Sequence, residues 1–147
     1  MNWKNVQTWA TAISTHSSNG RKIIFRYAKD FSPTFEFSSQ PDRVILVWKY
    51  ESEYGQPMKD DHRQMDLLED ALEPIVEEGR FATLALVSTG ENLREWIYYA
   101  RNGDEFIERI NVGLSEMPEF PIEIYVTSDP GWENYLVFKT GVREAAY

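Results

Sequence analysis

Nucleophilic and metal-binding side chains are scarce in this chain. It contains no cysteine, which excludes thiolate nucleophiles, disulfides and cysteine-ligated metals. Its only histidines, His16 and His62, lie in polar segments that are typical of a protein surface. The run Asp60-Asp61-His62 cannot surround a metal by itself and instead predicts the acidic first turn of a helix. Glycine-rich phosphate loops are also absent from the sequence, so we expect no cofactor, no metal, and a non-catalytic protein rather than an enzyme.

One group of aromatic and charged residues is suited to recognition. The turn Asp129-Pro130-Gly131 is followed by Trp132 and Tyr135, whose spacing of three allows them to share a face. Arg94 and Tyr98, from a predicted hairpin, complete the group. Tryptophan, tyrosine and arginine supply much of the binding energy at protein interfaces. A turn that packs both aromatics against the sheet, with Arg94 stacked over one of them, explains the same pattern.

A second hypothesis gives part of this group another role. Arg94 would hold an anionic group, and Asp129 or Glu95 would act as a base. The protein would then be a small-molecule-binding domain or a hydrolase-like enzyme. This hypothesis predicts a deep pocket that contains Arg94 and at least one carboxylate with a perturbed pKa.

Negative charge is concentrated in one segment. The net charge is −9, and residues 51–78 carry ten acidic and two basic side chains. Such a field favours a basic protein partner and disfavours nucleic acid as a direct ligand, whereas a solvated helix face would explain the charge without any partner. The candidate contact residues are Asp66, Glu69, Asp70 and Glu73.

Aromatic residues on predicted strands raise the question of RNA binding. RNA-recognition domains stack bases on such residues, and Trp48, Tyr50, Trp96 and Tyr98 lie on strand patterns here. The basic and aromatic signature of those domains is absent, and the acidic charge opposes phosphate. We therefore expect no direct binding of nucleic acid.

Two hydrophobic periods alternate along residues 43–128. Period-two strand patterns cover residues 43–50, 81–88, 93–100 and 121–127, and helical patterns begin at about Asp60 and at Asn102. The order strand, helix, strand, strand, helix, strand predicts an α+β fold, a ferredoxin-like βαββαβ sandwich.

Local signals set the predicted ends of the two helices. Pro74 inside the first helical pattern predicts a kink or an early end near Glu73. Asn102, with Glu105 three positions later, predicts a capping box that opens the second helix. Pro118 marks the predicted end of that helix.

The whole chain, residues 1–147, is predicted to form a single domain. Its parts are an N-terminal hairpin and linker (1–42), the βαββαβ core (43–128) and a short C-terminal extension (129–147). The hairpin strands are predicted at Thr8–Thr15 and Lys22–Ala28. No apolar stretch is long enough to span a membrane and no apolar leader is seen, so we expect a cytoplasmic protein without membrane contact.

Four short stretches resemble those of a bacterial family of unknown function, DUF695. They are Gly55-Gln56-Pro57, Leu67-Leu68-Glu69-Asp70-Ala71-Leu72, Arg94-Glu95-Trp96-Ile97-Tyr98-Tyr99 and Asp129-Pro130-x-Trp132-x-x-Tyr135. The resemblance covers roughly residues 40–138 and implies no established activity. Gly131-Trp132 is loosely similar to the regulator of ribonuclease E activity B, which implies an acidic cytoplasmic protein that binds and inhibits an RNA-degrading enzyme.

Charge, aromatic content and resemblance lead to one functional expectation. We expect a cytoplasmic interaction protein, acting as a regulator, an inhibitor or a toxin-neutralising partner, that binds a basic protein through its acidic face. Binding of this kind should weaken steeply as salt is added. A homodimer formed through a sheet face or edge is compatible with either functional hypothesis.

Overall fold

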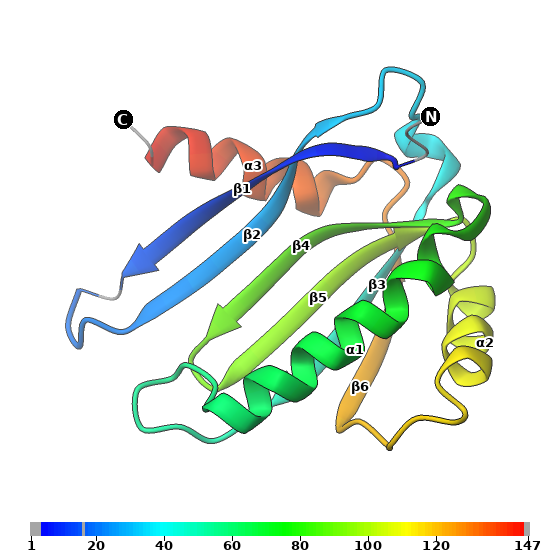
Figure 1. Ribbon diagram of the computed structural model, residues 1–147. Coiled ribbons are helices and arrows are strands. Elements are labelled where there is room, and N and C mark those ends of the chain that lie inside the picture. Colours follow the sequence, from blue (N-terminus) through cyan, green and yellow to red (C-terminus); the bar gives the residue numbers. More distant parts are fainter. Residues whose placement is uncertain (1–3, 16, 146–147) are drawn as a thin grey trace.

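The computed structural model describes residues 4–15 and 17–145 and is shown in Figure 1. The elements are β1 (Val6–Thr15), β2 (Lys22–Phe31), η1 (Phe37–Ser39), β3 (Asp42–Lys49), α1 (Lys59–Glu77), η2 (Glu78–Arg80), β4 (Ala82–Gly90), β5 (Leu93–Ala100), α2 (Gly103–Gly113), β6 (Ile122–Ser128) and α3 (Glu133–Ala145). His16, interpreted above as a surface residue, lies outside the described residues.

The strands form one antiparallel sheet within the described residues, in the order β1-β2-β4-β5-β3-β6. β1 and β6 are therefore its two edges. Three α-helices complete the fold of this part of the chain, which confirms the predicted α+β class. No helix found in it is long and apolar enough to cross a membrane.

Helices cover both faces of the sheet, with α1 and α2 on one side and α3 on the other (Figure 1). Leu68 and Leu72 of α1 pack with Trp96 in the first core. Trp132, at the start of α3, packs with Tyr99 in the second. Alternate residues of β5 thus enter opposite cores, as its period-two pattern predicts. The strand aromatics considered for RNA stacking (Trp48, Tyr50, Trp96 and Tyr98) are all buried in the first core.

The hairpin of β4 and β5 closes through a tight two-residue turn. Glu91 and Asn92 both have positive φ, 52° and 63°, as a type I′ turn requires. Residues 89 and 90, predicted as part of a longer loop, belong to β4 instead. Gly90 meets β2 so closely that a Cβ there would lie 2.6 Å from the carbonyl oxygen of Lys22. Only glycine fits this approach.

The predicted early end of α1 is wrong, because the helix continues through Pro74 to Glu77. Proline cannot donate the helical hydrogen bond from its own nitrogen to the carbonyl oxygen four residues earlier, so the helix continues at the cost of one bond. Val76, beyond the proline, is buried and packs the final turn against the core. Gly79 follows with a φ of 66°, the left-handed conformation predicted for its role as a stop.

The start of α2 follows the prediction, and its end does not. The side-chain oxygen of Asn102 accepts a hydrogen bond from the backbone N–H of Glu105 at 2.9 Å. The helix ends at Gly113 rather than near Pro118. A Cβ on Gly113 would lie 2.2 Å from Ile75 of α1, so the two helices touch where α2 ends.

The two terminal segments are more regular than predicted. The N-terminal hairpin forms, and its strand β2 joins the sheet by pairing Ile24–Tyr27 with Leu86–Thr89 of β4. The C-terminal extension contains the helix α3, whose Phe138 packs against Phe25 and Tyr27. α3 therefore covers the hairpin on the face that α1 leaves free.

Candidate functional site

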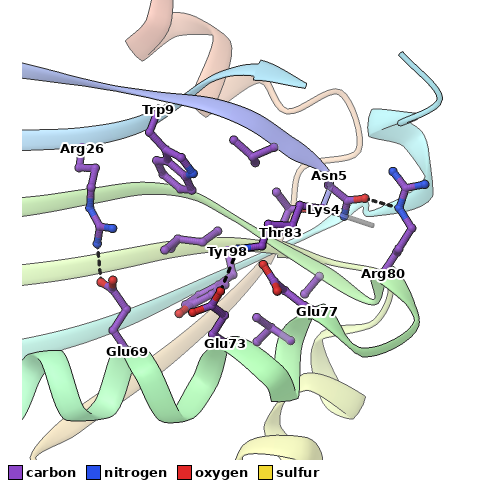
Figure 2. A pocket seen from close by; sticks show the side chains of 14 residues that line it. Lys4, Asn5, Trp9, Arg26, Glu69, Glu73, Glu77, Arg80, Thr83 and Tyr98 are labelled. Carbon is purple, nitrogen blue, oxygen red and sulfur yellow. Dashed lines mark hydrogen bonds and ion pairs between the residues drawn. The ribbon is translucent and has the colours of Figure 1, made fainter. Parts of the chain in front are cut away.

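A groove with a cavity of about 150 Å³ lies between α1 and the β1–β2 hairpin (Figure 2). α1 lies across the middle of the sheet and does not extend over the hairpin (Figure 1). The chemically active side chains of the lining are Lys4, Asn5, Trp9, Arg26, Glu69, Glu73, Glu77, Arg80, Thr83 and Tyr98. The groove thus combines carboxylates from the helix with cations and an aromatic ring from the sheet.

One wall of the groove is acidic. Asp66, Glu69, Asp70, Glu73 and Glu77 are spaced by three and four residues, so they follow one side of α1. We call these five residues the acidic stripe. Glu69, Glu73 and Glu77 line the cavity itself. All of them except Glu69 are exposed, so most of the stripe is open to a partner.

The opposite wall carries Lys4, Trp9 and Arg26. The Nζ of Lys4 lies 3.1 Å from a carboxylate oxygen of Glu73, and Arg26 forms an ion pair with Glu69. The guanidinium carbon of Arg26 is 5.5 Å from the centre of the Trp9 ring. Trp9 is 40% exposed, which is unusual for so large an apolar side chain. Two ion pairs therefore bridge the groove beside an accessible indole.

Glu69 has a structural task in addition to its place in the wall. Its Oε1 accepts a hydrogen bond from Nε1 of Trp96 at 2.8 Å and another from Arg26. Trp96 is fully buried, and no other acceptor is recorded for its indole N–H among the described residues. Glu69 thus ties helix, core and hairpin together.

Replacing Glu69 by alanine is expected to lower the free energy of unfolding by about 2 kcal/mol, because it leaves a buried indole N–H without an acceptor. Urea denaturation measures this loss. Asp70→Ala is the matched control: Asp70 is exposed and has no ion pair among the described residues, so it should change stability by less than about 0.5 kcal/mol. Equal losses in the two variants would contradict the assignment.

A ring of polar side chains closes one end of the groove. Nε of Arg80 donates to Oδ1 of Asn5 at 2.6 Å, and Nδ2 of Asn5 donates to Oγ1 of Thr83 at 2.8 Å. Thr83 donates to Gln40 at 2.6 Å, and Gln40 returns to the carbonyl oxygen of Arg80 at 3.0 Å. The ring fixes the start of β1 on β4. It leaves the buried Nη2 of Arg80 without a hydrogen-bond partner in the described structure.

Two ionisable groups of the groove have shifted pKa values. Burial raises the pKa of Glu77, and the charge of Lys4 lowers it by less. The hydrogen bond to Glu73 raises the pKa of Lys4, helped by the nearby charges of Glu77 and Glu73. Glu77 has no ion pair of its own among the described residues. A cation brought into the groove would therefore stabilise its charged form.

The recognition group predicted from the sequence does not come together. Arg94 and Tyr98 face α1, and Nε of Arg94 donates to Oγ1 of Thr89 at 2.8 Å. Asp129 lies on the far side of the sheet. Arg94 is stacked over Trp96 rather than over an aromatic of the C-terminal turn. Neither the groove nor the second described cavity, near α2, is lined by Arg94 or Asp129.

Trp132 and Tyr135 are core residues in this structure, 0% and 3% exposed. Asp129 supports them by accepting the hydroxyl hydrogen of Tyr99 at 2.8 Å and three N–H groups of Glu133 and Asn134. These contacts begin α3. The alternative explanation of the pattern, a turn that packs aromatics against the sheet, describes what these residues do here.

The four acidic residues predicted as contacts, unlike the recognition group, do lie together. Glu69 and Glu73 line the groove, and Asp66 and Asp70 lie beside them on α1. Asp66 is 3.2 Å from Nδ1 of His62. Asp60 and Asp61 occupy the first turn of α1, as predicted. Among the described residues, no three histidine or carboxylate side chains gather in a way that could hold a metal ion.

Sequence reasoning missed the sheet side of the groove: Lys4, Asn5, Trp9, Arg26 and Arg80. One signal was available, because β1 has no charged residue and Trp9 shares its face with threonines and Ile13 only, too few large apolar neighbours to bury an indole. The other four carry no local signal. Lys4, Asn5 and Arg26 approach α1 through the pairing of β2 with β4, between residues about sixty positions apart. Arg80 lies in η2, directly after α1.

Comparison with known proteins identifies a family but no individual relative. No curated protein and no solved structure matches the chain. The looser similarity to the regulator of ribonuclease E activity B therefore stays a prediction. A family model described as "Family of unknown function (DUF695)" matches residues 7–138, and the match includes the hairpin strands β1 and β2 that the sequence resemblance left out. The chain belongs to the family of unknown function DUF695.

Proposed function

We propose that this protein is a non-catalytic interaction module that binds a basic segment of another protein in the groove between α1 and the β1–β2 hairpin. One observation carries the proposal: the acidic stripe faces an exposed tryptophan across an open cavity. Within the described residues, Asp70 and Glu77 of that stripe have no ion pair. Glu77 lines the groove and Asp70 lies beside it on α1, so the groove and its margin offer carboxylates that no described cation pairs with.

The two walls suit a lysine or arginine side chain. A guanidinium forms paired hydrogen bonds with a carboxylate, and its flat face stacks on an indole ring such as that of Trp9. The ion pair of Lys4 with Glu73 is exposed on both sides, so it stabilises the free protein little and is readily exchanged. Long-range attraction to the acidic stripe would speed association, and contact with Trp9 would lengthen the life of the complex.

Regulator, inhibitor and toxin-neutralising partner are three roles that share this requirement. Each needs reversible and specific capture of a basic surface. The excess of acidic over basic residues on α1, seven against two, supports such capture. We place this activity in the cytoplasm, in keeping with the acidic chain and its lack of cysteine.

We also propose that residues 42–128 form a ferredoxin-like core to which the hairpin and α3 are added. The supporting observation is the strand order β4-β5-β3-β6, with α1 and α2 on one face. β3 and β4 are parallel and flank β5, and β5 and β6 are parallel and flank β3. Two interleaved split βαβ units give this order. In this description the groove lies where the added hairpin meets the core.

Reversing two charges of the acidic stripe, Asp70→Lys with Glu77→Lys, should abolish capture of the partner. The wild-type protein, immobilised and exposed to native lysate, is expected to retain one stoichiometric basic protein that mass spectrometry identifies. Its affinity for the purified partner should fall at least about tenfold in the variant and also fall steeply with added salt. Asp70 and Glu77 are exposed, so folding should be unaffected.

The matched control is Glu116→Lys with Glu119→Lys, which makes the same change in net charge at exposed positions away from the groove. It should bind the partner nearly as well as the wild type. Trp9→Ala separates the two walls, because it removes the indole and leaves the charge intact. Retention of no protein, or equal retention by the Asp70/Glu77 variant, would refute the proposal.

A further inference from the structure

We propose that the free edge of β1 pairs with β1 of a second copy of this chain. The two strands run antiparallel about a two-fold axis perpendicular to the sheet. Thr11 lies opposite Thr11 of the other copy at that axis, and Trp9 lies opposite Ile13. The two sheets become one continuous sheet. This inference concerns self-association and does not rest on the proposed basic partner. The dimer would compete with that partner, because both use Trp9 at the edge of the groove.

The two edges of the sheet differ in their protection. β6 follows Pro121 and carries Glu123, and both residue types discourage pairing with another strand. β1 is ten residues long and contains no charged residue and no proline. Its register is irregular only between Val6 and Trp9, so Trp9–Thr15 is a regular and unprotected edge. Free backbone groups on such an edge form a template for another strand.

The exposed side chains of β1 select a second copy rather than an arbitrary strand. Trp9 and Ile13 lie on the same face and are 40% and 59% exposed, and Ile24 of β2 lies directly beside Ile13. A two-fold axis perpendicular to the sheet keeps the same face of both sheets on one side. Residues that oppose each other must therefore be an even number of positions apart in the sequence. Among the registers near the middle of the strand, the one centred on Thr11 sets each Trp9 against an Ile13. An aromatic and a β-branched residue form a favourable cross-strand pair, and both become covered.

Charge is complementary in the same arrangement. The end of each hairpin, where Lys22 pairs with Thr15, comes beside the start of the partner's β1. That start lies next to the acidic end of the partner's groove, because Lys4 contacts Glu73 there. Lys22 lies on the same face of the sheet as Trp9 and has no ion pair among the described residues. Each basic hairpin end thus approaches the other copy's Glu73 and Glu77.

In this register Gln7–Thr15 of one copy faces the same stretch of the other, which gives a small interface, so we expect a dissociation constant in the micromolar range. Sedimentation velocity from about 1 µM to about 500 µM should show a shift from the 17.2 kDa chain toward twice that mass. Thr11→Lys places two like charges opposite each other at the axis and should weaken the dimer at least about tenfold. Thr127→Lys makes the same change on exposed β6 and should leave the dimer intact.

The absence of native cysteine allows a second test that does not depend on affinity. Mild oxidation of Thr11→Cys should give a disulfide-linked dimer, because the two sulfurs meet at the axis. Ser14→Cys should not cross-link, since the two residues would be about 20 Å apart in this register. A wild type that stays monomeric throughout overturns the proposal. So does a dimer lost in Thr127→Lys but kept in Thr11→Lys, or cross-linking of Ser14→Cys without Thr11→Cys.

Discussion

Replacing Trp132 by alanine is expected to lower the free energy of unfolding by about 4 kcal/mol, the largest loss we predict for a single substitution in this chain. The indole ring is fully buried and is stacked between two other aromatic rings, those of Tyr99 and Phe37. Its centre lies 4.1 Å from the ring of Tyr99 and 4.6 Å from that of Phe37. Its Nε1 donates to the carbonyl oxygen of Gln40 at 3.0 Å. Alanine would leave a cavity and an unpaired carbonyl group.

The backbone conformation of Trp132 also indicates that packing of its ring stabilises the fold. Its φ of 54° is uncommon for a residue with a large side chain and costs about 1 kcal/mol or more. Packing of the ring compensates for this strain. Thermal unfolding should show a drop of about 15 °C for Trp132→Ala. Tyr54→Ala, at a side chain that is 73% exposed, is the control and should change stability little. A similar small change in Trp132→Ala would contradict the structure.

Replacing Asp129 by asparagine is expected to lower the free energy of unfolding by about 3 kcal/mol at pH 7. The carboxylate accepts hydrogen bonds from the Tyr99 hydroxyl and from N–H groups of Glu133 and Asn134. The asparagine amide keeps only one acceptor oxygen. Its NH2 group replaces the other oxygen and would face N–H or O–H groups that also donate, so those hydrogen bonds are lost. Tyr99→Phe removes a single donor and should cost about 1 kcal/mol.

The loss of unfolding free energy caused by Asp129→Asn should become smaller as the pH falls. Burial alone would raise the pKa of Asp129, but the hydrogen bonds from Asn134, Tyr99 and the backbone outweigh it and hold the pKa below its ordinary value of 3.8. A carboxylate with a lowered pKa stabilises the fold above that ordinary value, and the contribution disappears as the pH falls through the folded pKa. The wild type should therefore lose stability below about pH 4, and the variant should lose less.

Urea denaturation of the wild type and of Asp129→Asn between pH 7 and pH 3 measures how their unfolding free energies approach each other. The difference in unfolding free energy should be full at neutral pH and narrow progressively under acid. A difference that stays constant over the whole range would show that the carboxylate is not stabilised by these donors. Its role would then be only to fill space at the start of α3.

Local patterns were sufficient for most of the elements. Strand β5 was predicted at its observed ends, residues 93–100, because its period of two is uninterrupted between two turns. The cap at Asn102 was also predictable, since its partner Glu105 is only three positions away. Pro74 shows the limit of such signals. Its local cost is real, but packing of residues beyond it outweighs that cost.

The acidic side of the groove could be predicted as well. Glu69 and Glu73 follow from helical spacing, and the concentration of charge in one segment is plain from composition. Their function in the fold could not be predicted. The bond from Glu69 to the indole of Trp96 requires α1 to lie across β5, and nothing within the helix specifies that placement.

The amino-acid sequence by itself determined the six strands and the helices α1 and α2, the alternation of side chains along each strand, and the acidic character of α1, but not the helix α3. These properties depend on neighbours within a few positions. Only the tertiary structure decided that Asp129 meets Tyr99 and not Tyr98, that Arg94 lies on the opposite face, and that Trp9 and Arg26 complete a groove with α1. The physical reason is that the order of strands, and the face each helix covers, result from packing between distant segments.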